Sequence, residues 1–218
     1  MKHKKIFIFI LFLICVLFII LGIVKSSVQI KVNKFVSQTD YDNDGIVDSE
    51  EFIYRARQEA ENKVEYTNEY YQGGYPPSDK GVCTDVVWRA FMQAGYVLRD
   101  MVNEDIKENR EDYPWIENID KNIDFRRVRN LEVFFDRNAE ILTTEIIPGD
   151  IENLEKWQGG DIVIFGKYKH IAIISDKRNY MGVPYIIHNA GAVAKEENTL
   201  ILWRDFQGGI TKHYRFSK

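Results

Sequence analysis

The sequence predicts an α+β fold in which helices pack on a small antiparallel sheet. Two observations support this: residues 51–138 contain stretches with helical character, and the chain after residue 158 consists of short β-branched and aromatic runs separated by turn residues. A group of helices followed by a group of strands is typical of an α+β domain. The 218 residues and the 45% hydrophobic content suffice for a packed core and exclude global disorder.

Four helices are expected before the strands. The run Glu51–Tyr66 has helix formers and no Gly or Pro. The next helix should run from about Val82 to Ala94, because its apolar residues form a stripe at helical spacing and Gly95 is a natural stop. Two more helices are expected over 97–109 and 131–138.

Four strands are expected in the last third of the chain. They are short, rich in β-branched and aromatic residues, and separated by turn residues, as is typical of antiparallel strands. The expected strands are Asp161–Phe165, His170–Ser175, Pro184–His188 and Ile210–Phe216.

An uncharged apolar segment near the start predicts attachment to the cell membrane. Ile6–Val24 contains 19 residues, and at about 1.5 Å per residue a helix of this length spans roughly 28 Å, close to the thickness of a bilayer core. Lys2, Lys4 and Lys5 precede it, so the positive-inside bias predicts a single-pass signal anchor with residues 26–218 outside the cytoplasm. The alternative is a long cleaved signal peptide, which would yield a secreted protein.

The charge and cysteine content exclude several classes of function. Residues 26–218 contain 25 Lys and Arg against 33 Asp and Glu, a net charge of −8, which argues against nucleic-acid binding. Two cysteines, Cys15 and Cys83, are too few for a disulfide scaffold or a Cys-rich zinc site. Because Cys15 lies in the apolar segment, Cys83 is the one thiol of the exported part.

Cys83 and two histidines are candidates for nucleophilic catalysis. Cys83 lies in the first turn of a predicted helix, where free N–H groups and the helix dipole are expected to lower a thiol pKa toward neutrality. Such a nucleophile needs a base, and the base needs an orienting group. His170 begins a strand and is the candidate base. His188 ends the next strand and is the candidate orienting residue, with Asn189 as its substitute because neighbours in a strand face opposite ways. The alternative is a small buried cysteine with histidines in structural positions.

Several separate motifs make the pattern similar to a known group of enzymes. A cysteine at a helix start is followed by Gly160–Val163, by His170–Ile173 and by a strand that ends in His188. This order resembles the NlpC/P60 group of papain-like cysteine peptidases and amidases, and more closely the DUF1287 family within that superfamily, over residues 50–216. The motifs that resemble DUF1287 are Gly81–Phe91, Asn122–Val128, Gly160–Val163, His188–Gly191 and His213–Arg215.

The resemblance implies a papain-like core in which Cys83 is the nucleophile, His170 the base and His188 the third polar residue. It implies a cysteine hydrolase that cleaves amide bonds, and the expected location adds cell-wall peptidoglycan peptides as the substrate. The hydrolase domain would occupy residues 67–218, with an insertion at about 100–158. Residues 1–25 would form the cytoplasmic tip and anchor, and residues 26–66 a tether, an acidic loop and a helix.

Two other functions remain open. One is a calcium-stabilised surface binding module with the same fold and no turnover, and the other is acyl transfer by the same cysteine. Arg126 and Arg127 would bind a substrate carboxylate or pair with Asp120 and Asp124, and we expect pairing.

Residues 40–51, here called the acidic loop, fit the calcium loop of an EF-hand. Oxygen ligands fall at positions 1, 3, 5, 9 and 12, glycine at position 6 and an apolar residue at position 8. We expect one structural Ca²⁺, because a hard cation binds six to eight oxygens, with a helix after the loop and a half motif or short helix before it. A solvated acidic turn is the alternative. The predicted ligands are Asp40, Asp42, Asp44, the Ile46 carbonyl, Asp48 and Glu51.

Overall fold

The fold was determined from a computed structural model that describes residues 10–14, 16, 30–35 and 37–217. Most of the predicted anchor, residues 6–24, lies outside the described residues, so its membrane topology stays a prediction. Within the described ranges no helix combines the length and the apolarity needed to cross a bilayer.

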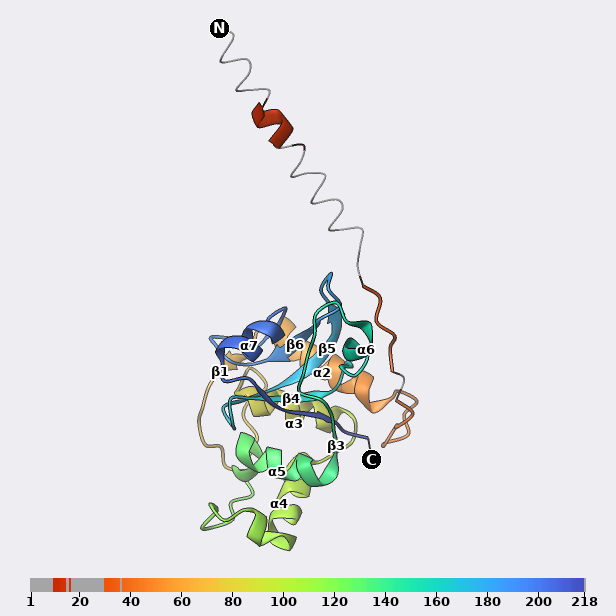
Figure 1. Cartoon of the computed structure of the whole chain (residues 1–218). Helices are drawn as coiled ribbons and strands as arrows, with labels where there is room; N and C mark the ends of the chain where they lie inside the picture. The colour runs from red at the N-terminus through yellow and green to blue at the C-terminus, as the bar shows by residue number, and fades with distance from the viewer. Residues whose placement is uncertain (1–9, 15, 17–29, 36, 218) are drawn as a thin grey trace.

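A six-stranded antiparallel sheet forms the centre of the domain (Figure 1). The four strands expected from the sequence occupy its four middle positions, which confirms their prediction. Two short edge strands were not predicted. In spatial order the strands are β3 (Glu140–Ile141), β8 (Ile210–Arg215), β4 (Ile162–Phe165), β5 (His170–Arg178), β6 (Pro184–His188) and β7 (Lys195–Glu197).

The four expected helices are present, with shifted ends. The first ends at Glu61 rather than at residue 66, because the chain turns at Lys63, whose φ of 52° is left-handed. The helix that contains Cys83 agrees with the prediction to within a residue. The four helices are α2 (Asp48–Glu61), α3 (Cys83–Gln93), α4 (Leu98–Glu108) and α5 (Val128–Asn138).

The remaining elements were not predicted from the sequence, and all of them are short. They are the parallel pair β1 (Glu65–Tyr66) and β2 (Lys80–Gly81), the 3₁₀ turns η1 (Arg110–Asp112) and η2 (Asp124–Arg126), and helices α6 (Ile151–Leu154) and α7 (Leu200–Phe206).

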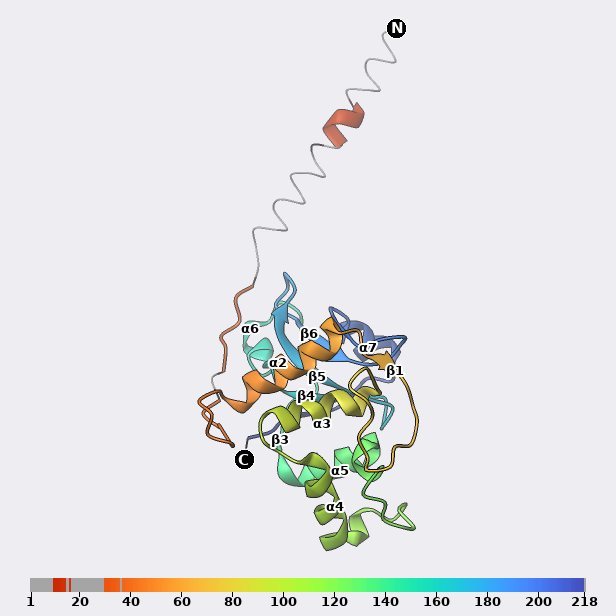
Figure 2. The same ribbon diagram turned by 180° about the vertical axis from the view of Figure 1, so that it is seen from behind.

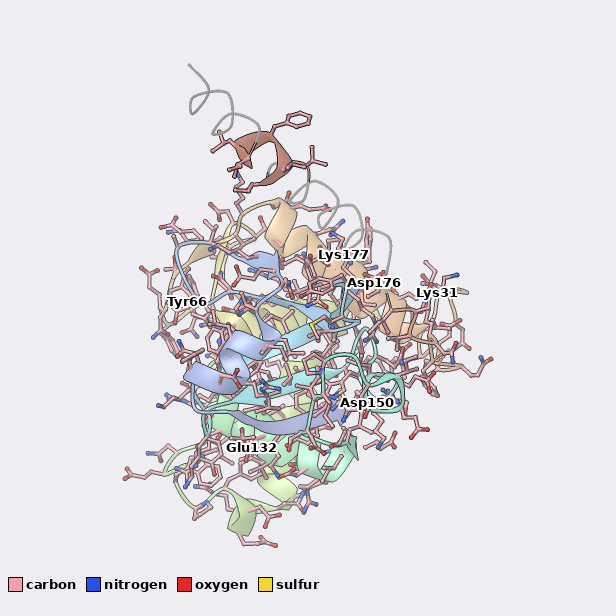
Figure 3. All side chains as sticks on the ribbon, turned by 45° about the horizontal axis from the view of Figure 1, so that its top comes forward. Lys31, Tyr66, Glu132, Asp150, Asp176 and Lys177 are labelled. Atoms are coloured by element: carbon pink, nitrogen blue, oxygen red, sulfur yellow. The ribbon has the colours of Figure 1, made fainter. Side chains whose placement is uncertain are left out.

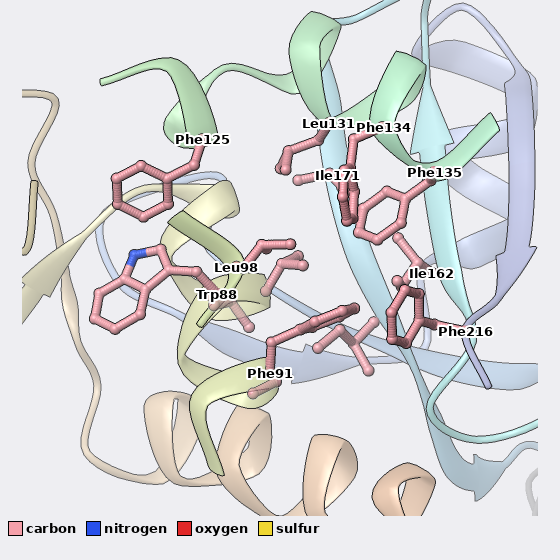
Figure 4. Packing of buried hydrophobic residues seen from close by; sticks show 14 of the residues in the cluster. Trp88, Phe91, Leu98, Phe125, Leu131, Phe134, Phe135, Ile162, Ile171 and Phe216 are labelled. Carbon is pink, nitrogen blue, oxygen red and sulfur yellow. The ribbon is translucent and has the colours of Figure 1, made fainter. Parts of the chain in front are cut away.

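Both faces of the sheet are buried. Successive side chains of a strand point to opposite sides, and each set packs into its own core cluster. Ile171 and Ile173 pack into the larger cluster with the residues of α2, α3 and α5. Ala172 and Ile174 pack on the other face with Trp157 and residues of α6 and α7. Figure 4 shows the larger cluster, where Phe91 and Phe135 of the helices and Phe216, which follows β8, gather beside Ile162 of β4.

Helix α2 contacts both helix α3 and the sheet. Phe52 stacks on Phe91 of α3 with ring centroids 4.6 Å apart, and both rings are buried. At its other side Arg57 donates to Glu196 of β7 at 2.7 Å. Helix α2 therefore packs into the same core as α3, as Figure 2 shows, although the sequence analysis assigned it to the segment before the hydrolase domain. Charged side chains such as Asp176 and Lys177 lie at the surface (Figure 3).

Candidate active site

Cys83 is the first residue of α3, as predicted, and the turn that starts the helix fixes its position. The Asp85 carboxylate accepts the Val82 backbone N–H at 2.7 Å, which satisfies a donor just ahead of the helix. The thiol side chain belongs to a residue that is 9% exposed. The backbone N–H of Ile171, the residue that follows His170 in β5, lies close enough to the sulfur to lower the thiol pKa.

The expected depression of the Cys83 pKa is wrong in direction. Burial raises the pKa of the thiol to about 11, and the backbone N–H groups of Ile171 and Thr84 offset only part of this effect. The thiolate has lost its hydration, and the partial charges at the helix start do not replace it. At pH 7 the group therefore rests as a thiol.

The two strand histidines form a hydrogen-bonded chain that ends on a carboxylate. His170 Nε2 lies 2.7 Å from His188 Nδ1, and His188 Nε2 lies 3.0 Å from Glu197 Oε1. We call His170, His188 and Glu197 the histidine chain. Glu197 is reached across β6 and β7, where His188 pairs with Lys195, so that Glu197 is a diagonal neighbour of His188.

The histidine chain determines which nitrogen of His170 carries a proton. A carboxylate of Glu197 only accepts, so His188 carries its proton on Nε2 and accepts through Nδ1. His170 must then donate from Nε2, which leaves its Nδ1 as a lone-pair acceptor. This is the tautomer that a general base requires.

His170 rests uncharged in this environment. Its ring stacks on Trp203 of α7 with centroids 4.3 Å apart, and the residue is 5% exposed. Burial, together with a smaller effect of the nearby His188, lowers the pKa of His170 to about 3. Burial also lowers the pKa of His188, while Glu197 acts in the opposite direction. Near pH 7 both imidazoles are therefore neutral.

The sulfur and the His170 ring approach the same end of β5 from its two sides. Cys83 belongs to the cluster that contains Ile171, on the α3 side, whereas the His170 ring lies against Trp203 on the α7 side. Within the described part of the chain no hydrogen bond joins the Cys83 sulfur to an imidazole nitrogen. The structure thus joins His170 to His188 directly and places the Cys83 side chain beside Ile171, the neighbour of His170 in β5, on the other face of the strand.

Asn189, the alternative to His188 as orienting residue, forms hydrogen bonds with residues other than His170. Its side-chain amide donates to the carbonyls of Val64 and Gly81, both at 3.1 Å. The first carbonyl lies just after α2 and the second lies two residues before Cys83. Asn189 therefore positions the start of α3, and His188 is the residue that contacts His170.

Arg126 pairs with a different carboxylate from the one expected. The prediction named Asp120 and Asp124, but Arg126 forms a bidentate ion pair with Asp85 at 2.7 and 2.8 Å, and both side chains are almost fully buried. Arg126 also donates to the carbonyl of Glu69. All its donor nitrogens face protein acceptors, so this guanidinium is not available to a substrate carboxylate. Arg127 does lie near Asp124, as expected, and its charge opposes the burial that raises the pKa of that carboxyl.

Two residues of the site were missed in the sequence. Glu197 lies in a Lys-Glu-Glu run that looks like a solvated surface segment, and Trp203 lies in a short helix with no clear apolar stripe. Side chains alternate between the two faces of β7, but this would have placed Glu197 beside His188 only if the β6–β7 register had been known.

The acidic loop lies at the other end of α2, away from the histidines. Oxygens of Asp40, Asp42 and Asp44 lie within 4.8 Å of one another. Asp48 and Glu51 lie in the first turn of α2 and are buried. The preceding residues 30–35 and 37–39 contain no helix, which leaves a half motif.

Comparisons with known proteins identify the family. Residues 53–216 match the family described as a domain of unknown function, DUF1287. The uncharacterized protein YijF of Escherichia coli (strain K12) is 38% identical over 171 residues, which cover 74% of this chain and 78% of YijF. No solved structure matches. The chain belongs to the DUF1287 family.

Proposed function

We propose that this protein is a papain-like cysteine hydrolase that cleaves amide bonds with Cys83 as nucleophile and His170 as base. The observation that carries the proposal is the histidine chain, in which Glu197 and His188 leave Nδ1 of His170 free to accept a proton. A linked pair of imidazoles on a carboxylate supplies a base and its orienting groups at the end of β5 where Cys83 also packs, although the sulfur and the His170 ring lie on different sides of the strand. The NlpC/P60 resemblance in the motif order supports the same reading.

The resting charges favour a general-base mechanism over a preformed ion pair. With the Cys83 pKa raised and the His170 pKa lowered, the Sγ proton would move to Nδ1 of His170 as sulfur attacks the amide carbon. This step requires the thiol and the ring, which rest on two sides of β5, to come within hydrogen-bond reach of each other. The carbonyl oxygen becomes an oxyanion, to which the Cys83 backbone N–H is a candidate donor. The C–N bond then breaks, and His170 returns its proton to the amine.

The second half of the reaction releases the acyl group. Water attacks the thioester, His170 accepts one proton from that water, and the sulfur leaves as a thiol when His170 returns it. An amine in place of the water would give acyl transfer by the same residues.

We place this reaction outside the cytoplasm, on peptide bonds of cell-wall peptidoglycan, with a single-pass anchor in the cell membrane. The apolar segment 6–24 and the basic residues before it support this location. The substrate follows from the location and from the likeness to amidases, so it rests on analogy.

A non-catalytic binding module is the second candidate, and specific observations favour it. Cys83 is 9% exposed, its pKa is raised to about 11, and no hydrogen bond from it to an imidazole exists among the described residues. At pH 7 such a thiol is ionised to only about one part in ten thousand. In this reading Cys83 is a packing residue and the histidine chain is structural.

The two candidates differ in thiol chemistry and in turnover. Iodoacetamide labelling of the full chain at pH 7, resolved by peptide mass spectrometry to separate Cys83 from Cys15, measures the first. Incubation with peptidoglycan fragments, followed by product mass spectrometry, measures the second and distinguishes hydrolysis from transfer. For the hydrolase, Cys83→Ala should lower turnover by about 10³-fold or more, and His170→Ala should slow both labelling and turnover.

Glu197→Gln tests the histidine chain itself. An amide can donate to His188 and thereby favour the wrong tautomer of both rings, so turnover should fall by roughly 10²–10⁴-fold. Glu61→Gln, at an exposed position in α2, is the matched control and should leave turnover unchanged. Retention of full hydrolysis by Cys83→Ala would refute the proposal, and an inert Cys83 together with no product would support the binding module.

A further inference from the structure

The acidic loop has the backbone of a cation-binding turn. The N–H groups of Asp44 and Gly45 both donate to the Asp40 carboxylate, at 3.2 and 3.0 Å, which folds the chain back over its first residue. Asn43 and Gly45 have φ values of 61° and 94°, the left-handed conformation that permits this tight reversal. Thr39 closes the loop by accepting the Asp48 backbone N–H at 2.9 Å. The carboxylates of Asp40, Asp42 and Asp44 thereby converge.

A second, independent observation points to a missing ligand. Glu51 is 2% exposed, and its Oε2 atom has no hydrogen-bond partner, while Oε1 accepts only a 3.3 Å bond from Gln93. Asp48, in the same first turn of α2 as Glu51, accepts the Tyr41 backbone N–H at 2.9 Å, so this turn packs against the loop that carries the aspartates. The open oxygen thus belongs to a buried side chain that lies near the convergent aspartates.

In the described part of the chain, no basic side chain forms an ion pair with the carboxylates of Asp40, Asp42, Asp44 or Glu51. Glu50, next to Glu51, is the loop carboxylate that does have a basic partner, because it pairs with Lys34 at the surface at 2.7 Å. Several carboxylates gathered without a counter-charge are costly, and a divalent cation with oxygen ligands removes that cost.

We propose that the acidic loop binds one calcium ion through Asp40, Asp42, Asp44, the Ile46 carbonyl and Glu51. Oxygen donors and a flexible loop suit Ca²⁺ better than the smaller Mg²⁺, which demands near-ideal octahedral geometry. Asp48, a predicted ligand, instead positions the loop, since its two oxygens accept the Tyr41 backbone N–H and the Tyr96 hydroxyl.

The bound ion would fix the start of α2 against the end of α3. Glu51 contacts Gln93 in the last turn of α3, and Tyr41 of the loop stacks on Tyr96 with centroids 4.0 Å apart. Because α2 also pairs with Arg89 of α3 and Glu196 of β7, the ion would stabilise the packing between the helices and the sheet. This role does not depend on catalysis by Cys83. The loop also lies ahead of residue 53, where the family match begins.

Calcium titration of the full chain, purified in detergent, tests the site. The wild type should unfold at a higher temperature in Ca²⁺ than in EGTA, with half-saturation in the range of about 0.01–1 mM and weaker binding of Mg²⁺. Isothermal titration calorimetry should show one ion per chain. Glu51→Gln should weaken binding by more than about tenfold, because it removes the ligand at position 12.

Glu50→Gln is the matched control, since it removes the neighbouring carboxylate that already pairs with Lys34, and it should bind calcium like the wild type. If Glu51→Gln fails to fold, Asp42→Asn, at an exposed position, carries the same expectation. A wild type with no calcium-dependent shift, or equal affinities for Glu51→Gln and Glu50→Gln, would overturn the proposal.

Discussion

The histidine chain and the acidic loop each contain buried ionisable residues, but they resolve the cost of burial differently. In the first, every hydrogen-bonding link ends on another group of the protein: His170 on His188, and His188 on Glu197. In the second, Glu51 keeps an oxygen without a partner. The difference teaches that the hydrogen bonds of the histidine chain are made within the protein, whereas the acidic loop leaves a carboxylate oxygen that the proposed calcium ion would bind.

The buried Asp85–Arg126 pair, like the histidine chain, is balanced within the protein, and its disruption should give the largest effect on stability. Arg126→Met leaves Asp85 buried without its counter-charge, so we expect a loss of about 3–5 kcal/mol in the free energy of unfolding, measured by urea denaturation. Asp205→Asn, which breaks the exposed contact with Arg204, is the control and should leave the urea midpoint in place. Equal midpoints for the two variants would mean that the buried pair is not needed.

The pH dependence of stability should expose the neutral state of His170. The folded pKa is lowered to about 3, so the unfolded chain binds a proton below about pH 6.5 that the folded chain does not bind. This contribution is therefore fully present above pH 6.5 and is lost as the pH falls toward 3. From pH 7.5 to pH 5.5 we expect a loss of about 1.4 kcal/mol in unfolding free energy from this residue.

His170→Gln should remove that slope in urea denaturation at the two pH values, because glutamine does not titrate in this range. An unchanged slope in the variant would show that His170 takes up a proton in the folded state, which contradicts the environment described here.

Alanine substitutions at two glycines distinguish the effect of loop docking on calcium binding from the effect of backbone strain. Gly95 and Gly73 have φ values of 80° and 88°, so alanine at either position costs about 1 kcal/mol from conformation alone. A Cβ at Gly95 would also lie 2.9 Å from the Cβ of Asp42, whereas one at Gly73 meets nothing within 4 Å. Gly95→Ala should therefore lower calcium affinity several-fold and Gly73→Ala should not, as measured by calorimetry. Similar affinities in both variants would show that loop docking does not shape the site.

The central strands were predictable because the apolar residues that indicate them are adjacent in the sequence. A strand buried on both faces reads as a continuous apolar run, and Ile162–Phe165 and His170–Ser175 have that composition. The edge strand β7 has the sequence Lys-Glu-Glu and becomes a strand only through pairing with β6. Glu197, which completes the histidine chain, was missed for the same reason.

The candidate site was predicted in its residue types but not in its electrostatics. The position of Cys83 at a helix start follows from nearby residues, but its pKa depends on packing against β5, which is distant in sequence. The partner of Arg126 was assigned to neighbouring aspartates, whereas the true partner lies 41 residues away. The acidic loop shows the opposite case, because its oxygens are adjacent in sequence and three of them converge as the motif predicts.

The side-chain amide of Asn189 has a consequence for the order in which parts of the chain fold during synthesis. It holds the carbonyls of Val64 and Gly81 together, at the exit of one helix and the entrance of the next. A nascent chain that has not yet been synthesised past residue 188 lacks these two hydrogen bonds. The residues just before Cys83 are therefore not held in position until most of the polypeptide has been made. The Cys83 thiol is thus positioned late, by a residue that is synthesised more than a hundred positions after it.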